Sequence, residues 1–202
     1  MDIIVLVLLF ISIVIHEYAH AYTAYLLGDP TAQAQGRLTL NPLAHIDLIG
    51  TIILPLFLWL THSGIIIGWA KPVPINPMFF RNRIRGIIMV SFAGPLANIL
   101  LAGLLWFIVK FTLIGFIASF KEIFLLGISL NLLLALFNLI PLAPLDGSKI
   151  LLIFIPQRFL PFYFRWESLG FPLLIIALYL GLVDKVLIPI WELILKQLLT
   201  TF

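Results

Sequence analysis

Three ionisable residues lie within five positions near the start of the chain: His16, Glu17 and His20. If this segment is helical, residues i and i+4 share a face, so both imidazoles can bind one metal ion while Glu17 stands beside it. The His-Glu-x-x-His spacing is typical of zinc peptidases, in which the glutamate serves as general base. The motif therefore predicts hydrolysis by a metal-activated water.

The motif ends a strongly apolar run. Residues 3–15 carry no charge, and Ser12 is the only polar residue among them. Ionisable groups inside a lipid bilayer are costly and usually functional, so the pattern indicates chemistry within the membrane. The alternative is two buried histidines bonded to neighbouring helices, with Glu17 neutralised by one of them. It is disfavoured because it places three ionisable groups on adjacent turns without a use.

Composition predicts an all-α polytopic integral membrane protein. Of 202 residues, 62% are hydrophobic and only 10% are charged, whereas soluble domains carry about 25% charged residues. The net charge of +3 is spread over loops, so it indicates topology and not nucleic-acid binding. The absence of cysteine excludes disulfides, thiolate metal sites and cysteine nucleophiles. The first apolar run carries the motif and lacks a basic start, so it does not resemble a cleavable signal peptide.

We expect five to six membrane-spanning helices, with a re-entrant or short β-like segment between the first two core spans. Residues 36–40 alternate enough to suggest a short strand. The expected catalytic core covers residues 1–156, and residues 157–202 form a C-terminal transmembrane hairpin in the same domain. The apolar stretches on which this rests are 3–27, 48–67, 86–110, 120–140, 170–183 and 186–201.

Topology depends on residues 48–67, which contain Pro55 and a polar break. If they enter the membrane and return, nine of the twelve Lys and Arg residues share one side; if they span once, eight do. The positive-inside rule therefore favours the re-entrant arrangement, with the basic side cytoplasmic. This places His16 nearer the cytoplasmic end of its helix, and we expect a bacterial inner membrane.

A catalytic zinc ion usually has three protein ligands and one open position. The candidates for the third ligand include His45, Asp47, His62 and Asp146. Asp146 follows a span that prolines terminate, where it is either a ligand or a helix N-cap. Beside a His-Glu-x-x-His helix the ligand role is favoured. We expect one Zn²⁺ per chain, although such nitrogen and oxygen sites also accept iron or cobalt.

These motifs resemble the site-2 protease family of intramembrane zinc metalloproteases, in particular its compact bacterial branch without PDZ or CBS domains. The resemblance implies that His16, His20 and Asp146 bind zinc and that Glu17 is the general base. Beyond residue 156 the similarity is only general hydrophobicity. The segments that carry the resemblance are 16–20, 36–43, 68–74, 92–98 and 138–147.

Several polar residues are candidates for supporting roles. Asn98 and Asn138 are predicted to assist substrate or oxyanion positioning, although amides also commonly bond between membrane helices. For Asn131 the interhelical role is favoured. His45 is either a residue behind the metal ligands or an ordinary loop contact, and the loop contact is favoured. His62 is expected to be a loop residue, and the arginines of 81–85 are expected to anchor the topology.

The leading hypothesis is an intramembrane endopeptidase whose partners are single-span or membrane-embedded proteins, within the lipid bilayer. A substrate strand is expected to pair with residues 36–40 or 68–76. One rival is a metal transporter, which has no use for a base at Glu17. Another is an inactive scaffold, which the four filled catalytic positions disfavour. The oligomeric state and the substrate's identity stay open.

Overall fold

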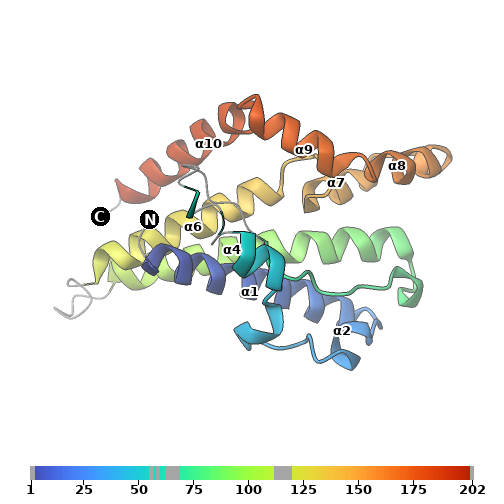
Figure 1. Cartoon of the computed structure of the whole chain (residues 1–202), viewed down its shortest axis with the longest axis horizontal. Coiled ribbons are helices and arrows are strands. Elements are labelled where there is room, and N and C mark those ends of the chain that lie inside the picture. Colours follow the sequence, from blue (N-terminus) through green and yellow to red (C-terminus); the bar gives the residue numbers. More distant parts are fainter. Residues whose placement is uncertain (1–2, 55–56, 58–59, 62–68, 112–119, 201–202) are drawn as a thin grey trace.

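The computed structural model describes residues 3–54, 57, 60–61, 69–111 and 120–200 (Figure 1). Within these residues the regular structure is helical and contains no strand. The elements are α1 Ile3–Leu26, α2 Thr31–Ala34, η1 Pro42–His45, η2 Leu48–Ile53, η3 Pro77–Phe79, α4 Arg83–Phe111, α6 Lys121–Asn138, α7 Asp146–Ile150, η4 Leu151–Ile153, η5 Gln157–Phe159, α8 Leu160–Glu167, α9 Gly170–Tyr179 and α10 Leu182–Leu199.

Three helices, α1, α4 and α6, are long and apolar enough to cross a membrane. The pair α9 and α10 is bent by 73° and adds a fourth span if the two are counted together. The predicted all-α polytopic architecture is therefore confirmed. The number of spans among the described residues is lower than the five to six expected, and much of the segment 48–67 lies outside the described residues.

The three long helices pack against one another and form the centre of the molecule (Figure 1). Their outward faces carry large exposed apolar side chains, such as Leu100 at 64% and Phe107 at 55% exposure. In water such a surface would be a liability, whereas in a bilayer it faces lipid tails. The chain is therefore a membrane protein with its polar groups on the inside.

A node of hydrogen bonds joins α1, α4 and α6 at their centre. The fully buried Asn98 donates from Nδ2 to the Ser12 backbone oxygen at 3.1 Å and to Asn131 Oδ1 at 2.8 Å. Asn131 in turn donates to Ser12 Oγ at 2.9 Å. Amides in apolar surroundings need such partners, so this node specifies how the three helices align. Asn131 thus bonds between helices, as expected.

The first helix ends at Leu26, and the turn after it passes through Gly28, whose positive φ of 100° favours glycine. The next residue, Asp29, is buried and accepts the Asn76 N–H at 2.6 Å and the Thr31 N–H at 2.9 Å. This carboxylate ties the end of α1 to the chain just before α4. Residues 29–37 and 69–76 consequently lie at the same end of the bundle.

This arrangement agrees with the topology in which Arg37 shares a side with the arginines of 81–85. The guanidinium of Arg37 donates to the Lys71 carbonyl oxygen at 2.6 Å. This bond joins residues 29–37 directly to residues 69–76. The short strand expected at residues 36–40 is not formed: these residues make a turn and a bend. The reason is that the Arg37 N–H bonds backward to Ala32, and the part of the chain that the structure describes offers no strand for pairing.

The C-terminal helices pack onto the three-helix centre. Trp191 of α10 donates its indole N–H to the Ser129 backbone oxygen of α6 at 3.3 Å. Trp106 of α4 donates to the Leu198 backbone oxygen of α10 at 3.2 Å. A buried apolar cluster, comprising Leu145, Leu174, Val183 and Leu187, joins the same parts. These contacts attach residues 157–200 to the core.

The polar node should contribute measurably to stability. We expect Asn131→Leu to lower the free energy of unfolding by about 1–2 kcal/mol, because it removes two bonds between helices and leaves Asn98 partly unsatisfied. The measurement is a denaturant titration in detergent micelles. The matched control is Asn138→Leu, since the Asn138 side chain donates only to Leu134 of its own helix. Equal destabilisation by both changes would contradict a role in joining the helices.

Candidate metal centre

Three ligand atoms converge at the centre of the bundle: Nε2 of His16, Nε2 of His20 and Oδ2 of Asp146. The two nitrogens lie 3.0 Å apart, and each lies 3.2 Å from the carboxylate oxygen. Both histidines are buried, with 5% and 7% exposure. Among the described residues, these three form the one group of His, Asp or Glu side chains suited to hold a metal ion.

The other nitrogen of each imidazole reveals the protonation pattern. His16 Nδ1 lies 2.7 Å from Asn98 Oδ1, and His20 Nδ1 lies 2.7 Å from the Val90 backbone oxygen. Both partners are acceptors, because the Asn98 amide nitrogen is directed at the Ser12 carbonyl oxygen. Each Nδ1 must therefore carry the proton, so in the neutral rings both Nε2 atoms present lone pairs.

Two lone pairs and a carboxylate oxygen thus face one another within a buried space. Such an arrangement is repulsive unless a cation lies between the three atoms or protons are taken up. Ligands about 2.0–2.1 Å from a tetrahedral zinc ion lie about 3.3–3.4 Å from one another, close to the separations seen here. The donor set therefore fits zinc, and His16, His20 and Asp146 could hold the ion.

Local sequence explains why the ligands can come together. His16 and His20 occupy successive turns of α1, so they face α4 from the same side. Opposite them is Gly94, where an added Cβ would lie 2.5 Å from His20 Nε2 and 2.6 Å from His16 Nε2. Only glycine leaves room for both imidazoles against α4.

Asp146 reaches the centre from the region after α6. That helix ends at Asn138, and Pro141 and Pro144 prevent it from continuing. Asp146 then begins the short helix α7, while the following Gly147 packs so closely on Leu139 that a Cβ would lie 2.2 Å from its carbonyl oxygen. This tight return places the carboxylate beside the two histidines.

Glu17 stands beside the metal centre and not within the group of ligands. Its Oε2 accepts the backbone N–H of Val73 at 2.9 Å. Val73 belongs to residues 69–76, which have no regular secondary structure, and its side chain packs with Ala21 of α1. We call residues 69–76 the covering segment. One carboxylate oxygen of Glu17 is thus held, and its second oxygen has no hydrogen-bond partner among the described residues.

The covering segment is attached to the protein at several points. Trp69 N–H donates to Gly50, Lys71 N–H to His45, and Asn76 N–H to Asp29. Arg37, only 6% exposed, donates to the Lys71 carbonyl oxygen. These bonds hold the segment in place on the side of Glu17.

The remaining candidates lie outside the group of metal ligands. The His45 ring is fully buried and its Nε2 bonds to the Thr39 carbonyl oxygen at 2.8 Å, so it supports the loop that carries the covering segment. Asp47 caps η2 through the N–H groups of Ile49 and Gly50. The side chain of Asn138 bonds within α6. His62 lies outside the described residues.

The structure also gives roles at the site to residues for which sequence reasoning predicted none there. Val73, Arg37 and Asp29 place the covering segment, and Gly94 makes space for the imidazoles. Val73 acts through its backbone, so its residue type carries no signal. The available signal was that Arg37, Val73 and Gly94 lie in the motif segments 36–43, 68–74 and 92–98.

Comparison with known proteins identifies the family. The chain is 39% identical over 188 residues to the "Putative zinc metalloprotease YwhC" of Bacillus subtilis, covering 90% of this chain and 82% of YwhC. The same description applies to Rip2 of Mycolicibacterium smegmatis, 33% identical over 67% of this chain, and to MJ0611 of Methanocaldococcus jannaschii, 34% identical over 45%. The chain spans about half the length of Rip2.

The chain therefore belongs to the zinc metalloprotease family that includes YwhC. It is an enzyme of the metalloprotease class, with a ligand group that fits the metal named for its relatives. No family model matches the chain, and no solved structure matches it either.

The bond between Asn98 and His16 should govern metal affinity. We expect Asn98→Ala to weaken zinc binding about 10- to 100-fold, because His16 loses the acceptor that fixes its tautomer and ring orientation. Zinc affinity is measured by competition with a chromogenic chelator in detergent. Asn138→Ala is the control and should bind zinc as the wild type does. Unchanged affinity in Asn98→Ala would contradict a role in positioning His16.

Proposed function

We propose that this protein is an intramembrane zinc endopeptidase of the site-2 protease type, which cleaves single-span or membrane-embedded proteins. The observation that carries the proposal is the position of the ligand group. The buried His16 and His20 and the partly buried Asp146 lie between helices that are long and apolar enough to cross a membrane, and Glu17 stands at their edge. A peptidase site in that place is suited to substrates that are themselves in the bilayer.

In this mechanism, a bound zinc ion supplies acidification of water and stabilisation of the charge that develops on the scissile carbonyl. Glu17 takes the proton from the attacking water through its free carboxylate oxygen and returns it to the leaving amine. The Val73 N–H holds the other oxygen, so the carboxylate keeps one orientation. Asn98 acts through His16, because both its amide nitrogen and its oxygen are already bonded within the bundle.

The substrate must present an extended peptide, since a helix shields its own peptide bonds. The covering segment is the better candidate for pairing with it, because residues 36–40 form a turn and a bend. The segment's N–H groups at Trp69, Lys71 and Val73 are engaged, and prolines have none. Pairing would therefore use the remaining groups, including Ala70. Asn138, whose amide bonds only within α6, is the candidate for contacting the substrate or oxyanion.

We further propose that the protein lies in the bacterial inner membrane with its site nearer the cytoplasmic side. The support is the gathering of basic residues at the end of the bundle where α1 ends and α4 begins. Positive charge marks the cytoplasmic side of membrane proteins. Cleavage of a substrate here would occur close to that surface.

Replacing Glu17 distinguishes a protease from a metal transporter, because only proteolysis needs a general base. We expect Glu17→Gln to keep about one zinc per chain and to lower the cleavage rate by at least 10²- to 10⁴-fold, the usual contribution of a general base. Both forms are incubated in detergent with a panel of single-span proteins, and metal is quantified by atomic spectrometry.

The matched control is His16→Ala, which should lose both zinc and cleavage. Cleavage by Glu17→Gln at the wild-type rate would refute the assigned mechanism. Zinc flux into liposomes that Glu17→Gln leaves intact, without cleavage by either form, would instead support a transporter.

The hydrogen bond from Val73 to Glu17 allows a precise test, because proline at this position removes the N–H donor. Residues 72 and 74 are already prolines, so an extended backbone is preserved. We expect Val73→Pro to lower kcat about 10- to 100-fold without loss of zinc, as expected for a hydrogen bond to a charged group.

Val73→Ala keeps the donor and removes only part of a buried side chain. It should therefore retain most of kcat. If Val73→Ala loses as much kcat as Val73→Pro, the packing of the segment, and not the N–H, orients the base.

A further inference from the structure

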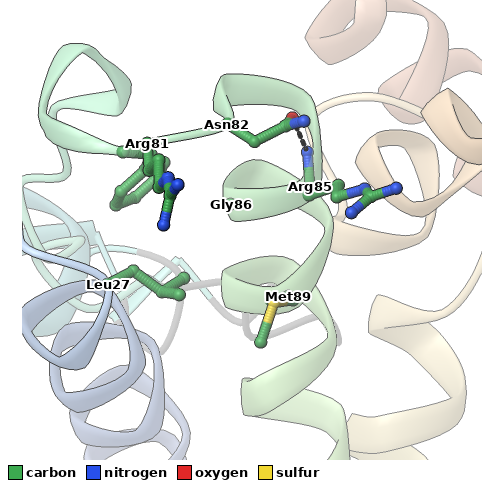
Figure 2. Close-up of a pocket in the computed structure, with 7 residues that line it drawn as sticks. Leu27, Arg81, Asn82, Arg85, Gly86 and Met89 are labelled. Carbon is green, nitrogen blue, oxygen red and sulfur yellow. Dashed lines mark hydrogen bonds between the residues drawn. The ribbon is translucent and has the colours of Figure 1, made fainter.

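A cavity of about 460 Å³ lies where α1 ends and α4 begins, outside the metal centre (Figure 2). The residues that line it combine cationic, polar and apolar side chains: Leu27, Phe80, Arg81, Asn82, Arg85, Gly86 and Met89. No carboxylate is among these lining residues. The nearby Asp29 is buried, with its oxygens bonded to Thr31 and Asn76. The lining therefore carries the positive charges of Arg81 and Arg85, and no lining residue carries a negative charge.

The cationic groups are free to bind a ligand. In Figure 2 the side chain of Arg81, which lies in the chain just before α4, extends toward Leu27, whereas the side chain of Arg85 extends from α4 in the other direction. Within the described part of the chain, neither guanidinium has a hydrogen-bond or ion-pair partner. Asn82 caps α4 through its Oδ1, which accepts the Arg85 N–H at 3.1 Å, and its amide nitrogen is available as a donor. The positive end of the α4 dipole adds to this field.

The cavity lies where α1 ends and α4 begins, and both helices are long and apolar enough to span a membrane. Below its cationic rim is Met89, 53% exposed, and one turn further along α4 is Phe92, 44% exposed. Arg85, Met89 and Phe92 follow the i, i+4, i+7 pattern and so share one face of the helix. A charged rim that continues into an apolar face matches a molecule with an anionic head and an alkyl tail.

We propose that this cavity binds an anionic phospholipid, with its phosphate at Arg81 and an acyl chain along Met89 and Phe92. Guanidinium groups suit phosphate because their donors match its oxygens. Anionic lipids are also enriched in the cytoplasmic leaflet, where basic residues attract them. A lipid in this position bridges the ends of α1 and α4, so its binding stabilises the folded protein. The site is independent of the proteolytic activity.

The test compares lipid retention by variants that each lose one positive charge. Wild type, Arg81→Gln, Arg85→Gln and Arg83→Gln are purified in detergent and titrated with phosphatidylglycerol or with phosphatidylcholine of the same acyl chains, and bound lipid is counted by native mass spectrometry. Arg83 belongs to the same basic cluster but does not line the cavity. It is therefore the matched control.

We expect phosphatidylglycerol to bind in preference to phosphatidylcholine. Arg81→Gln should weaken its binding about fivefold, which corresponds to about 1 kcal/mol per charge near the surface. Arg85→Gln should weaken it by less, and Arg83→Gln should change it by less than twofold. Equal losses in all three variants would overturn the proposal in favour of diffuse surface charge. Equal binding of the two lipids would show an apolar groove without headgroup recognition and would also overturn it.

Two further measurements separate the sources of phosphate and guard against misfolding. Inorganic phosphate or glycerol phosphate should not displace the bound lipid; displacement would mean that the site takes free anions and not a lipid. For the wild type, phosphatidylglycerol should raise Tm more than phosphatidylcholine does, because it binds the folded form. This measurement needs no variant. The proposal fails if the two lipids raise Tm equally.

Discussion

The imidazole of His16 must donate a hydrogen bond from Nδ1 and keep the lone pair of Nε2 free, and the packing of α1, α4 and α6 allows both. Its Nδ1 donates to Asn98, which leaves Nε2 free to face His20 and Asp146. The side-chain oxygen of Asn98 is available to accept this hydrogen bond because the amide nitrogen of Asn98 donates to Ser12 and Asn131. The alignment of three helices and the chemistry of the metal centre therefore depend on one buried amide.

Burial makes this dependence strict. Inside an apolar bundle an amide or imidazole cannot form hydrogen bonds to water, so it is costly unless it bonds to a protein group or a ligand. Most groups find a protein partner, through the node between α1, α4 and α6. The three converging ligand atoms face one another instead, and a cation between them would be bound by their lone pairs. The same logic explains why the chain presents its large apolar side chains outward and keeps small residues such as Gly94 beside the site.

The covering segment links the region after α1 to the predicted catalytic base, Glu17. Asp29 and Arg37, which follow α1, form hydrogen bonds that fix this segment. The Val73 N–H of the same segment donates to Glu17 and so fixes the orientation of its carboxylate. The base is therefore oriented by a part of the chain that is distant in sequence and has no regular secondary structure. The cavity with Arg81 adjoins the same end of α1 and α4, and its lining residue Phe80 packs in one cluster with Ile75 of the covering segment.

Much of the site could be predicted because local spacing decides it: a helical period of 3.6 puts His16 and His20 on one face, and the apolar runs decide that α1, α4 and α6 are helices. Asp146 was identified only in combination with that motif, and the short strand expected at residues 36–40 did not form. The partners of Asn98, the room made by Gly94 and the bond from Val73 to Glu17 required the tertiary structure. They join residues far apart in the chain, through backbone groups and close approaches that residue type does not encode. The sequence by itself therefore determined the metal-binding chemistry and the membrane setting, whereas packing between helices decided which atoms orient the ligands and the base.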